Sequence, residues 1–251
     1  MGRAWLRGKK ALVTGAARRI GRAIALALAD EGVHVVLHSS TSAGEARDLA
    51  SEIEGRGVSA WTVQADFRRP PELESLVGRA LDLAGGLDVL VNSASIFPAS
   101  RLEDLTFPGL LESLEVNAWA PLVLSRELAR RVGAGRIVNL EDTRIAGFDR
   151  THAGYMLSKH VLAAITRALA LELAPGITVN AVRPGLILPP PGEDLRYVER
   201  LAGKLPLRRH GDPEDVADAV VFLASSGFVT GEVVYVDGGR HLRESADAAA
   251  R

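Results

Sequence analysis

Short runs of apolar and β-branched residues alternate with helix-like segments along almost the whole sequence, and this alternation restricts the possible folds more than any other feature. The runs that predict strands are residues 10–14, 33–37, 58–65, 87–91, 136–140, 177–182 and 232–236. The segments with helical spacing between them are residues 21–31, 43–54, 71–83, 108–132, 153–173 and 213–224. Strands that alternate with helices of about ten or more residues are typical of a parallel sheet covered by helices on both faces. The sequence therefore predicts an α/β fold, a Rossmann-type doubly wound parallel sheet of seven strands.

No linker or internal repeat interrupts this pattern, so residues 1–251 are expected to form a single domain. The segment after the sixth predicted strand is rich in proline and glycine and then becomes helical, which favours a substrate lid at about residues 186–208. Residues 243–251 are small or charged and are expected to be flexible.

Charge and composition exclude several classes of function. Thirty basic residues oppose 31 acidic ones, which argues against a nucleic-acid-binding protein because such binding needs a concentrated positive surface. The absence of cysteine excludes disulfides and thiolate zinc sites, and it fits a reducing cytoplasm. No run reaches the ~20 apolar residues of a membrane span, and the start of the chain lacks the apolar core of a signal peptide. We therefore expect a cytoplasmic protein that acts on a small molecule, without a metal, a nucleic acid or a membrane.

Ligands of doubly wound sheets bind at the carboxyl ends of the strands, so the residues that directly follow each predicted strand are the best candidates. The first such turn is residues 14–21, TGAARRIG, which opens the first predicted helix. A helix N-terminus offers free N–H groups and a partial positive charge, which suit a pyrophosphate. The alternative is an ordinary strand–helix turn. The candidate cofactor-binding residues here are Gly15, Arg18, Arg19, Ile20 and Gly21.

The end of the second predicted strand favours NADP(H) over NAD(H). An acidic residue at this place would hold the ribose 2′-hydroxyl of NAD. The sequence has His38, Ser39 and Ser40 instead, and hydroxyl groups together with Arg18 or Arg19 could hold a 2′-phosphate. The alternative is a solvated polar loop.

Small and polar residues also follow the third and fourth predicted strands, at the same edge of the sheet. Small residues there allow a flat ring to lie close to the backbone, although both segments could be ordinary turns. Phe97 follows at the expected mouth of the site, where it is either a ring-stacking residue or a packing residue. The candidates from these two segments are Asp66, Phe67, Asn92, Ser93, Ala94 and Ser95.

Tyr155 and Lys159 lie four residues apart near the start of a long predicted helix, so they share one helix face. A lysine beside a phenol stabilises the phenolate and lowers the tyrosine pKa from about 10 toward neutrality. Such a tyrosine can serve as a proton donor near pH 7. This spacing often arises by chance, but its position after the fifth predicted strand favours a catalytic pair.

In the types of these motifs and in their order along the chain, the sequence resembles the short-chain dehydrogenase/reductase family over about residues 8–242. The residues that carry the resemblance are Thr14, Gly15, Gly21, Asp66, Asn92, Asn117, Tyr155, Lys159, Arg183, Pro184, Gly185, and residues 230–239. The resemblance implies that Lys159 binds the nicotinamide ribose and helps Tyr155 donate a proton, and that Asn117 holds a water in a proton relay. It also implies that Pro184 and Gly185 line the nicotinamide, with Leu186 as a further cofactor contact.

One departure from the family pattern concerns the catalytic centre. Thirteen residues before Tyr155, where the family has a serine, this sequence has Asp142. An ionised carboxylate only accepts hydrogen bonds, and it would repel the oxyanion that develops during ketone reduction. It suits a substrate that presents N–H donors and is protonated on nitrogen, as a pterin ring does. The alternative is that Asp142 is a solvated loop residue and Thr143 replaces the serine.

The departures together resemble the branch of pteridine reductases and dihydromonapterin reductases. The similar segments are residues 14–21, 92–97 and 237–242, together with Asp142. The resemblance implies that Phe97 stacks a pterin against the nicotinamide, and that Arg19 contacts cofactor phosphate and can face the substrate. The expected substrate-binding residues are Arg19, Ser95, Phe97, Asp142 and Tyr155.

The sequence therefore predicts an NADPH-dependent reductase of a dihydropterin or a related pteridine such as dihydrofolate. A carbonyl reductase, such as a 3-oxoacyl-[acyl-carrier-protein] reductase, is the main alternative, and a nucleotide-binding regulator without turnover is a remote one. Family relatives are usually homotetramers that associate through two long helices, which correspond here to residues 108–132 and 153–173.

Overall fold

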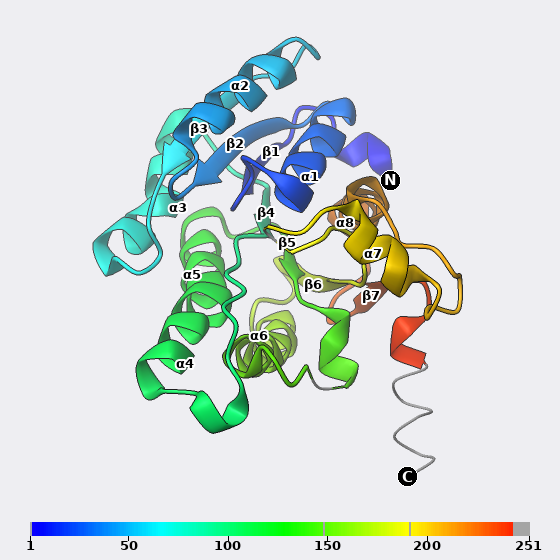
Figure 1. The fold of residues 1–251 in the computed structure, drawn as a ribbon. Helices are drawn as coiled ribbons and strands as arrows, with labels where there is room; N and C mark the ends of the chain where they lie inside the picture. The colour runs from blue at the N-terminus through cyan, green and yellow to red at the C-terminus, as the bar shows by residue number, and fades with distance from the viewer. Residues whose placement is uncertain (1, 148, 191, 243–251) are drawn as a thin grey trace.

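Seven parallel strands form a single sheet in the computed structural model, which describes residues 2–147, 149–190 and 192–242 (Figure 1). The strands are β1 (Lys10–Val13), β2 (His34–Ser39), β3 (Ala60–Gln64), β4 (Val89–Asn92), β5 (Gly135–Leu140), β6 (Ile177–Pro184) and β7 (Val233–Val236). Their order across the sheet is β3-β2-β1-β4-β5-β6-β7. The predicted doubly wound α/β fold is confirmed.

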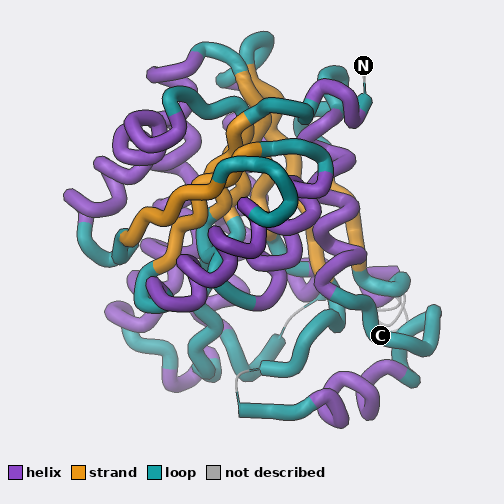
Figure 2. The backbone as a smooth tube through the Cα atoms, turned by 90° about the horizontal axis from the view of Figure 1, so that it is seen from above, coloured by secondary structure: helices purple, strands orange, loops and turns teal. Residues whose placement is uncertain are grey.

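Helices cover both faces of this sheet (Figures 1 and 2). They are α1 (Arg19–Asp30), α2 (Ala43–Glu54), α3 (Pro70–Ala84), α4 (Phe107–Leu114), α5 (Ala120–Val132), α6 (Ala153–Glu172), α7 (Leu195–Ala202) and α8 (Pro213–Ser225). Helices α1, α2 and α8 contribute to one apolar layer, and α3, α5 and α6 contribute to the other.

The central strand β1 shows why the strands read as unbroken apolar runs. Ala11 and Val13 belong to the layer beneath α1 and α8, whereas Leu12 belongs to the layer beneath α3 and α5. Successive side chains of a strand point to opposite faces, so a strand covered on both sides needs an apolar residue at every position. All three side chains are fully buried.

The predicted helix over residues 108–132 is two helices, α4 and α5, separated by a π-helical turn over Glu115–Trp119. Pro121 lies in the first turn of α5, directly after this interruption. The π-helical turn surrounds Asn117, and short π-helical turns are frequent at functional sites.

The carboxyl ends of the parallel strands meet at one edge of the sheet, where the loops after β1, β4, β5 and β6 come together. Helix α7 lies in the predicted lid segment, and its small apolar cluster holds Leu186, Val198, Ala202 and Leu205. Position 191 of the lid and the tail over residues 243–251 lie outside the described residues. Among the helices that are described, none is both long and apolar enough to cross a membrane.

Candidate active site

A cavity of about 400 Å³ opens at this edge of the sheet and brings most of the predicted residues together. It lies where the β1–α1 turn meets the loops that follow β4, β5 and β6. The predicted residues that line it are Gly15, Arg18, Arg19, Ile20, Gly21, Ser93, Ala94, Ser95, Phe97, Asp142, Tyr155, Lys159, Pro184 and Gly185.

The turn after β1 requires glycine at two positions. Gly15 has a φ of 64°, and a Cβ atom there would lie 2.8 Å from Ala94 Cα. A Cβ atom on Gly21 would lie 2.2 Å from the carbonyl oxygen of Gly15. Helix α1 begins directly after this turn without a side-chain cap, so its first N–H groups can bind an anion. The turn therefore fits the pyrophosphate of a dinucleotide.

Thr14 ties the turn after β1 to the loop after β4. Its hydroxyl oxygen accepts hydrogen bonds from Ser93 N and Ala94 N, both at 3.0 Å. This pair of bonds holds the two backbone segments close to each other, which leaves a floor of small residues at the centre of the cavity.

Tyr155 and Asp142 form the central hydrogen bond of the cavity. The Tyr155 hydroxyl donates to Asp142 Oδ2 at 2.6 Å, and Asp142 Oδ1 accepts from Arg144 N at 2.7 Å. Lys159 is buried beside them and donates from Nζ to the carbonyl oxygen of Leu140 at 2.7 Å. Its ammonium group lies 5.6 Å from the centre of the Tyr155 ring.

The expected lowering of the Tyr155 pKa is wrong for this structure. Burial, and then the charge and hydrogen bond of Asp142, raise the pKa of Tyr155 well above its usual value near 10. Burial also lowers the pKa of Lys159 to about 8, although Asp142 and Glu141 oppose that change. The phenol therefore keeps its proton at neutral pH, which suits a proton donor and not a base.

Thr143 is not placed to replace the family serine. Its side chain is fully buried, and its hydroxyl group donates to the carboxylate of Asp237, away from the cavity. Asp142, in contrast, lines the cavity. The carboxylate is therefore the side chain that this loop presents to a ligand.

The side-chain amide of Asn117 makes four hydrogen bonds within the protein. Its Oδ1 accepts from Ile96 N at 2.9 Å and from the Ser95 hydroxyl at 3.0 Å. Its Nδ2 donates to Ile96 O and to the Ser158 hydroxyl, both at 3.0 Å. The side chain thus fixes the loop after β4, and the expected role of Asn117 in holding a water stays a prediction.

His38, a candidate cofactor-binding residue, has both ring nitrogens engaged within the protein. Its ring is buried, accepts from Gly15 N at 3.2 Å, and lies 3.0 Å from Ala65 O. It also stacks on the ring of Phe67 at 4.6 Å between centroids. Burial lowers the pKa of His38 to about 4, so the ring is neutral. His38 therefore supports the glycine turn from beneath.

Two other candidate cofactor-binding residues, Arg18 and Asp66, have charged partners. Arg18 forms an ion pair with Glu45 of α2, a residue that was not expected near the site. Asp66 pairs with Arg68, whose Nη2 lies 2.8 Å from its carboxylate. Residues expected in the site that do not line the cavity are His38, Ser39, Ser40, Asp66, Phe67, Asn92, Asn117 and Leu186.

Two of those residues have clear structural roles instead. Asn92 is buried and donates to Asn139 Oδ1 at 2.8 Å, which joins the ends of β4 and β5. The side chain of Leu186 belongs to the apolar cluster of the lid. Ile187 and Leu188, which directly follow it, line the cavity in its place.

Phe97 forms an aromatic wall of the cavity. It stacks on His152 with 3.7 Å between ring centroids, and it meets the Tyr155 ring edge-on at 4.6 Å. The guanidinium group of Arg144 lies 4.8 Å from the centre of the Phe97 ring. Arg144 was not expected in the site, although a cation two residues after Asp142 in a site loop was a signal for it.

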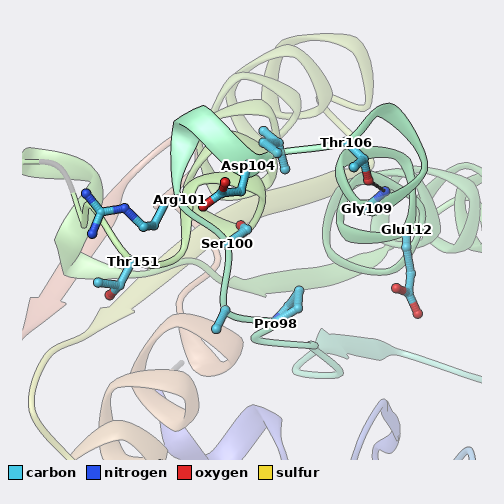
Figure 3. A pocket seen from close by; sticks show the side chains of 10 residues that line it. Pro98, Ser100, Arg101, Asp104, Thr106, Gly109, Glu112 and Thr151 are labelled. Carbon is cyan, nitrogen blue, oxygen red and sulfur yellow. Dashed lines mark hydrogen bonds between the residues drawn. The ribbon is translucent and has the colours of Figure 1, made fainter.

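A larger hollow of about 510 Å³ lies outside this site, between the loop over residues 98–106 and the start of α4 (Figure 3). Thr106 accepts from Gly109 N at 3.3 Å beside it. Neither Asp142 nor Tyr155 lines this hollow, so we assign the chemistry to the smaller cavity. Within the described residues, no group of three or more histidine, aspartate or glutamate side chains is arranged to hold a metal ion.

Comparisons with known proteins agree with the fold. A family model described as "Enoyl-(Acyl carrier protein) reductase" matches residues 15–241. The chain is 33% identical over 242 residues to the 3-oxoacyl-[acyl-carrier-protein] reductase FabG of Staphylococcus aureus, which covers 93% of this chain and 98% of that protein.

Solved structures with the same fold carry the cofactor that the turn after β1 fits. FolM alternative dihydrofolate reductase 1 from Brucella canis, complexed with NADP, superposes with a TM-score of 0.90 at 33% identity, covering 95% of this chain and 96% of that one. A short-chain dehydrogenase from Burkholderia cenocepacia J2315, in complex with NADP, gives a TM-score of 0.85 at 37% identity, covering 93% and 98%.

The sheet, the glycine turn and the Tyr155–Lys159 pair define an oxidoreductase of Rossmann type. With the matches above, the chain belongs to the short-chain dehydrogenase/reductase family.

Proposed function

We propose that this protein is an NADPH-dependent reductase of a dihydropterin or a related pteridine, and that it reduces a C=N bond of the ring. The observation that carries this proposal is the hydrogen bond between Tyr155 and Asp142, inside the cavity. A carboxylate at this place accepts N–H donors of a pteridine ring, whereas it would repel the oxyanion of a ketone.

The glycine turn, Arg18 and Arg19 are the residues that would hold NADP(H). Glycine is required at positions 15 and 21 because a side chain at either would meet backbone atoms, and the uncapped start of α1 suits a pyrophosphate. The solved relatives bind NADP, which supports this choice. When bound, the cofactor supplies the hydride for the ring carbon.

Residues of the chain supply the proton for the ring nitrogen and orient the pteridine ring. Tyr155 donates its proton to the ring nitrogen, and it carries that proton at neutral pH because burial and Asp142 raise its pKa. Asp142 accepts N–H groups of the ring and thereby fixes its position. Phe97 is the aromatic side chain of the cavity wall, beside Tyr155. Lys159 places a positive charge beside the phenol that becomes negative as its proton leaves.

A 3-oxoacyl-[acyl-carrier-protein] reductase remains the second candidate because of the 33% identity to the Staphylococcus aureus enzyme over 93% of the chain. The test is NADPH oxidation followed at 340 nm, with 7,8-dihydrobiopterin and an acetoacetyl thioester measured side by side. Turnover of the pterin alone supports the proposal. Turnover of the thioester alone contradicts it and favours the second candidate.

A further inference from the structure

Asp237 follows β7 directly and carries a buried carboxylate that has no part in the chemistry proposed above. The residue is 6% exposed and does not belong to the lining of the active-site cavity. It nevertheless contacts two walls of that cavity, the loop after β5 and the turn after β6. Because a buried charge is costly unless it is hydrogen-bonded, its place beside both walls calls for an explanation.

The carboxylate of Asp237 is fixed by its own turn. Oδ1 accepts a hydrogen bond from Gly239 N at 2.9 Å, and Oδ2 accepts one from His241 N at 2.9 Å. Oδ2 also lies 2.8 Å from His241 Nδ1. Burial would raise the pKa of this carboxyl group, but hydrogen bonds from Thr143 and His241 lower the pKa below its ordinary value. The group is therefore ionised at neutral pH and acts only as an acceptor.

Thr143 is the residue of the loop after β5 that reaches this fixed carboxylate. Its side chain is fully buried, and its hydroxyl group donates to Asp237 Oδ2. Asp142, directly before it, has an extended backbone with a φ of −153° and a ψ of 139°. Successive side chains of an extended chain point to opposite sides. The bond that turns Thr143 toward Asp237 therefore turns Asp142 toward the cavity.

The other hydrogen bonds of the Asp142 side chain do not anchor it in the same way. Arg144 N belongs to the same turn and moves with it, and the Tyr155 hydroxyl gives up its proton in the proposed reaction. The bond from Thr143 to Asp237 joins this turn to the end of β7, the strand at one edge of the sheet. It is therefore kept at the step in which Asp142 has to hold the ring.

Asp237 also packs against the wall on which the cofactor is expected. Gly185 N donates to Val236 O at 2.9 Å, and a Cβ atom on Gly185 would lie 2.5 Å from Asp237 Cα. Gly185 lines the cavity and is a candidate contact of the nicotinamide. One residue after β7 thus sets the spacing between the Asp142 carboxylate and the place of the cofactor.

We propose that Asp237 is a positioning residue of the active site, which acts through Thr143 to hold the Asp142 carboxylate in the cavity at a fixed distance from the cofactor. This inference rests on the proposed function, because it takes the orientation of the pteridine ring by Asp142 as given. It places the effect of Asp237 on the rate of the reaction and not on the binding of NADPH.

Thr143→Val tests the proposal, because it removes the hydroxyl group, keeps the shape of the side chain and leaves Asp142 in the chain. We expect kcat for 7,8-dihydrobiopterin to fall about tenfold with NADPH affinity unchanged, since a displacement of about 1 Å can cost up to about a hundredfold in rate. Thr143→Ser keeps the hydroxyl group and should restore most of the rate. Thr178→Val, on β6, is the matched control and should change neither value, because the buried Thr178 hydroxyl has no partner among the described residues.

Asp237→Ala tests the other partner of the bond. It should lower kcat at least as much as Thr143→Val does. Adding Thr143→Val to Asp237→Ala should cost nothing further, because the two residues act as one unit. Circular dichroism shows which variants are folded. Thr143→Ala replaces Thr143→Val if the latter does not fold, and the comparison with Thr143→Ser decides the outcome if Asp237→Ala does not.

A wild-type kcat in Thr143→Val, or an equal loss in Thr143→Ser or Thr178→Val, would overturn the inference. Failure of the wild-type protein to reduce dihydrobiopterin would contradict the proposed function, and crystal structures then test the positioning directly. In Thr143→Val, the Asp142 carboxylate should have left Tyr155, with their oxygens more than about 3.5 Å apart. A bond kept at 2.6 Å would contradict the role of Asp237.

Discussion

At the scale of single residues, the identity of the side chain at position 142 decides which chemistry this site supports. The sequence identifies this position, because it lies thirteen residues before Tyr155. The sequence does not show whether Asp142 or Thr143 faces the ligand, since neighbouring residues at the end of a strand point in opposite directions. The structure answers this through the bond from Thr143 to Asp237.

The direction of the Tyr155 pKa shift was predicted wrongly for a similar reason. The spacing of the two residues places them on one helix face, but it does not reveal that the lysine donates to Leu140 or that a carboxylate lies closer to the phenol. Burial and the nearest charge determine the direction of a pKa shift, and both depend on the tertiary structure.

Burial of neutral His38 should make the protein less stable in mild acid. Its pKa falls from an ordinary value of 6.5 to about 4 on folding, so the unfolded chain binds more protons between these two values. Stability from this group is therefore present above pH 6.5 and decreases as the pH falls toward 4. From the linkage relation, we expect the free energy of unfolding to be about 2 kcal/mol lower at pH 5 than at pH 7 on account of His38.

Urea unfolding of the wild-type protein and of His38→Asn at the two pH values measures this term. Asparagine keeps an acceptor for Gly15 N but does not titrate, so the variant should lose that part of the pH dependence. His160→Asn, at an exposed position, is the matched control and should retain it. A pH dependence that is the same in all three proteins would contradict a buried neutral His38.

At the scale of elements, the sequence predicted which segments are strands and which are helices, but it did not predict where a helix is interrupted. Helix α2 was predicted with the bounds that the structure shows, and the other strands and helices were placed to within a few residues, because their hydrophobic periodicity is clear. The π-helical turn over Glu115–Trp119 was missed, since it inserts one residue into a helix without changing the composition.

The turn between β1 and α1 should tolerate no side chain at Gly21. A Cβ atom there would lie 2.2 Å from the Gly15 carbonyl oxygen, so Gly21→Ala must displace the phosphate-binding turn. We expect NADPH to bind at least about tenfold more weakly, measured by the fluorescence of the bound nucleotide. Gly44→Ala, in helix α2 with no atom near the added methyl group, is the matched control.

The control should bind NADPH as the wild-type protein does and should be slightly more stable, because alanine is favoured over glycine in a helix by about 1 kcal/mol. Unchanged NADPH affinity in Gly21→Ala would show that the turn does not carry the cofactor.

At the scale of the whole molecule, several apolar side chains remain exposed on the elements that were predicted to form subunit contacts. Phe107, on α4, is 73% exposed, and Trp119, in the π-helical turn, is 51% exposed. Leu157 and Val161, on α6, are also exposed. Large apolar side chains gathered on neighbouring helices favour a protein–protein contact.

We therefore predict that the protein is a homotetramer in solution. Light scattering on a size-exclusion column should give about four times the mass of the 26.7 kDa chain. Trp119→Glu should produce smaller species, because a buried charge without a partner is costly. Ser51→Glu, at an exposed position on α2, which is not predicted to form subunit contacts, serves as a control for the added charge. A monomeric wild-type protein would contradict the prediction.

The fold and most of the cavity could be predicted because parallel strands place every strand-following turn at one edge. A second pocket, of about 330 Å³ and lined by Arg144, Tyr197 and Arg240 among others, could not be predicted from the sequence. Its lining comes from the β5–α6 loop, α7 and the turn after β7, which are far apart in the sequence. Their approach depends on how the lid packs, and no local pattern of residues encodes that packing.

The central claim is that the carboxylate at position 142 commits this site to a pteridine, and the substitution Asp142→Ser tests it most directly. The measurement is kcat/KM for 7,8-dihydrobiopterin and for an acetoacetyl thioester, with NADPH affinity as the check that the protein is intact. We predict at least about a hundredfold loss for the pterin, the usual effect of removing a group that orients and supports proton transfer, together with a gain for the thioester. Pterin turnover equal to that of the wild-type protein, with unchanged NADPH binding, would contradict the claim.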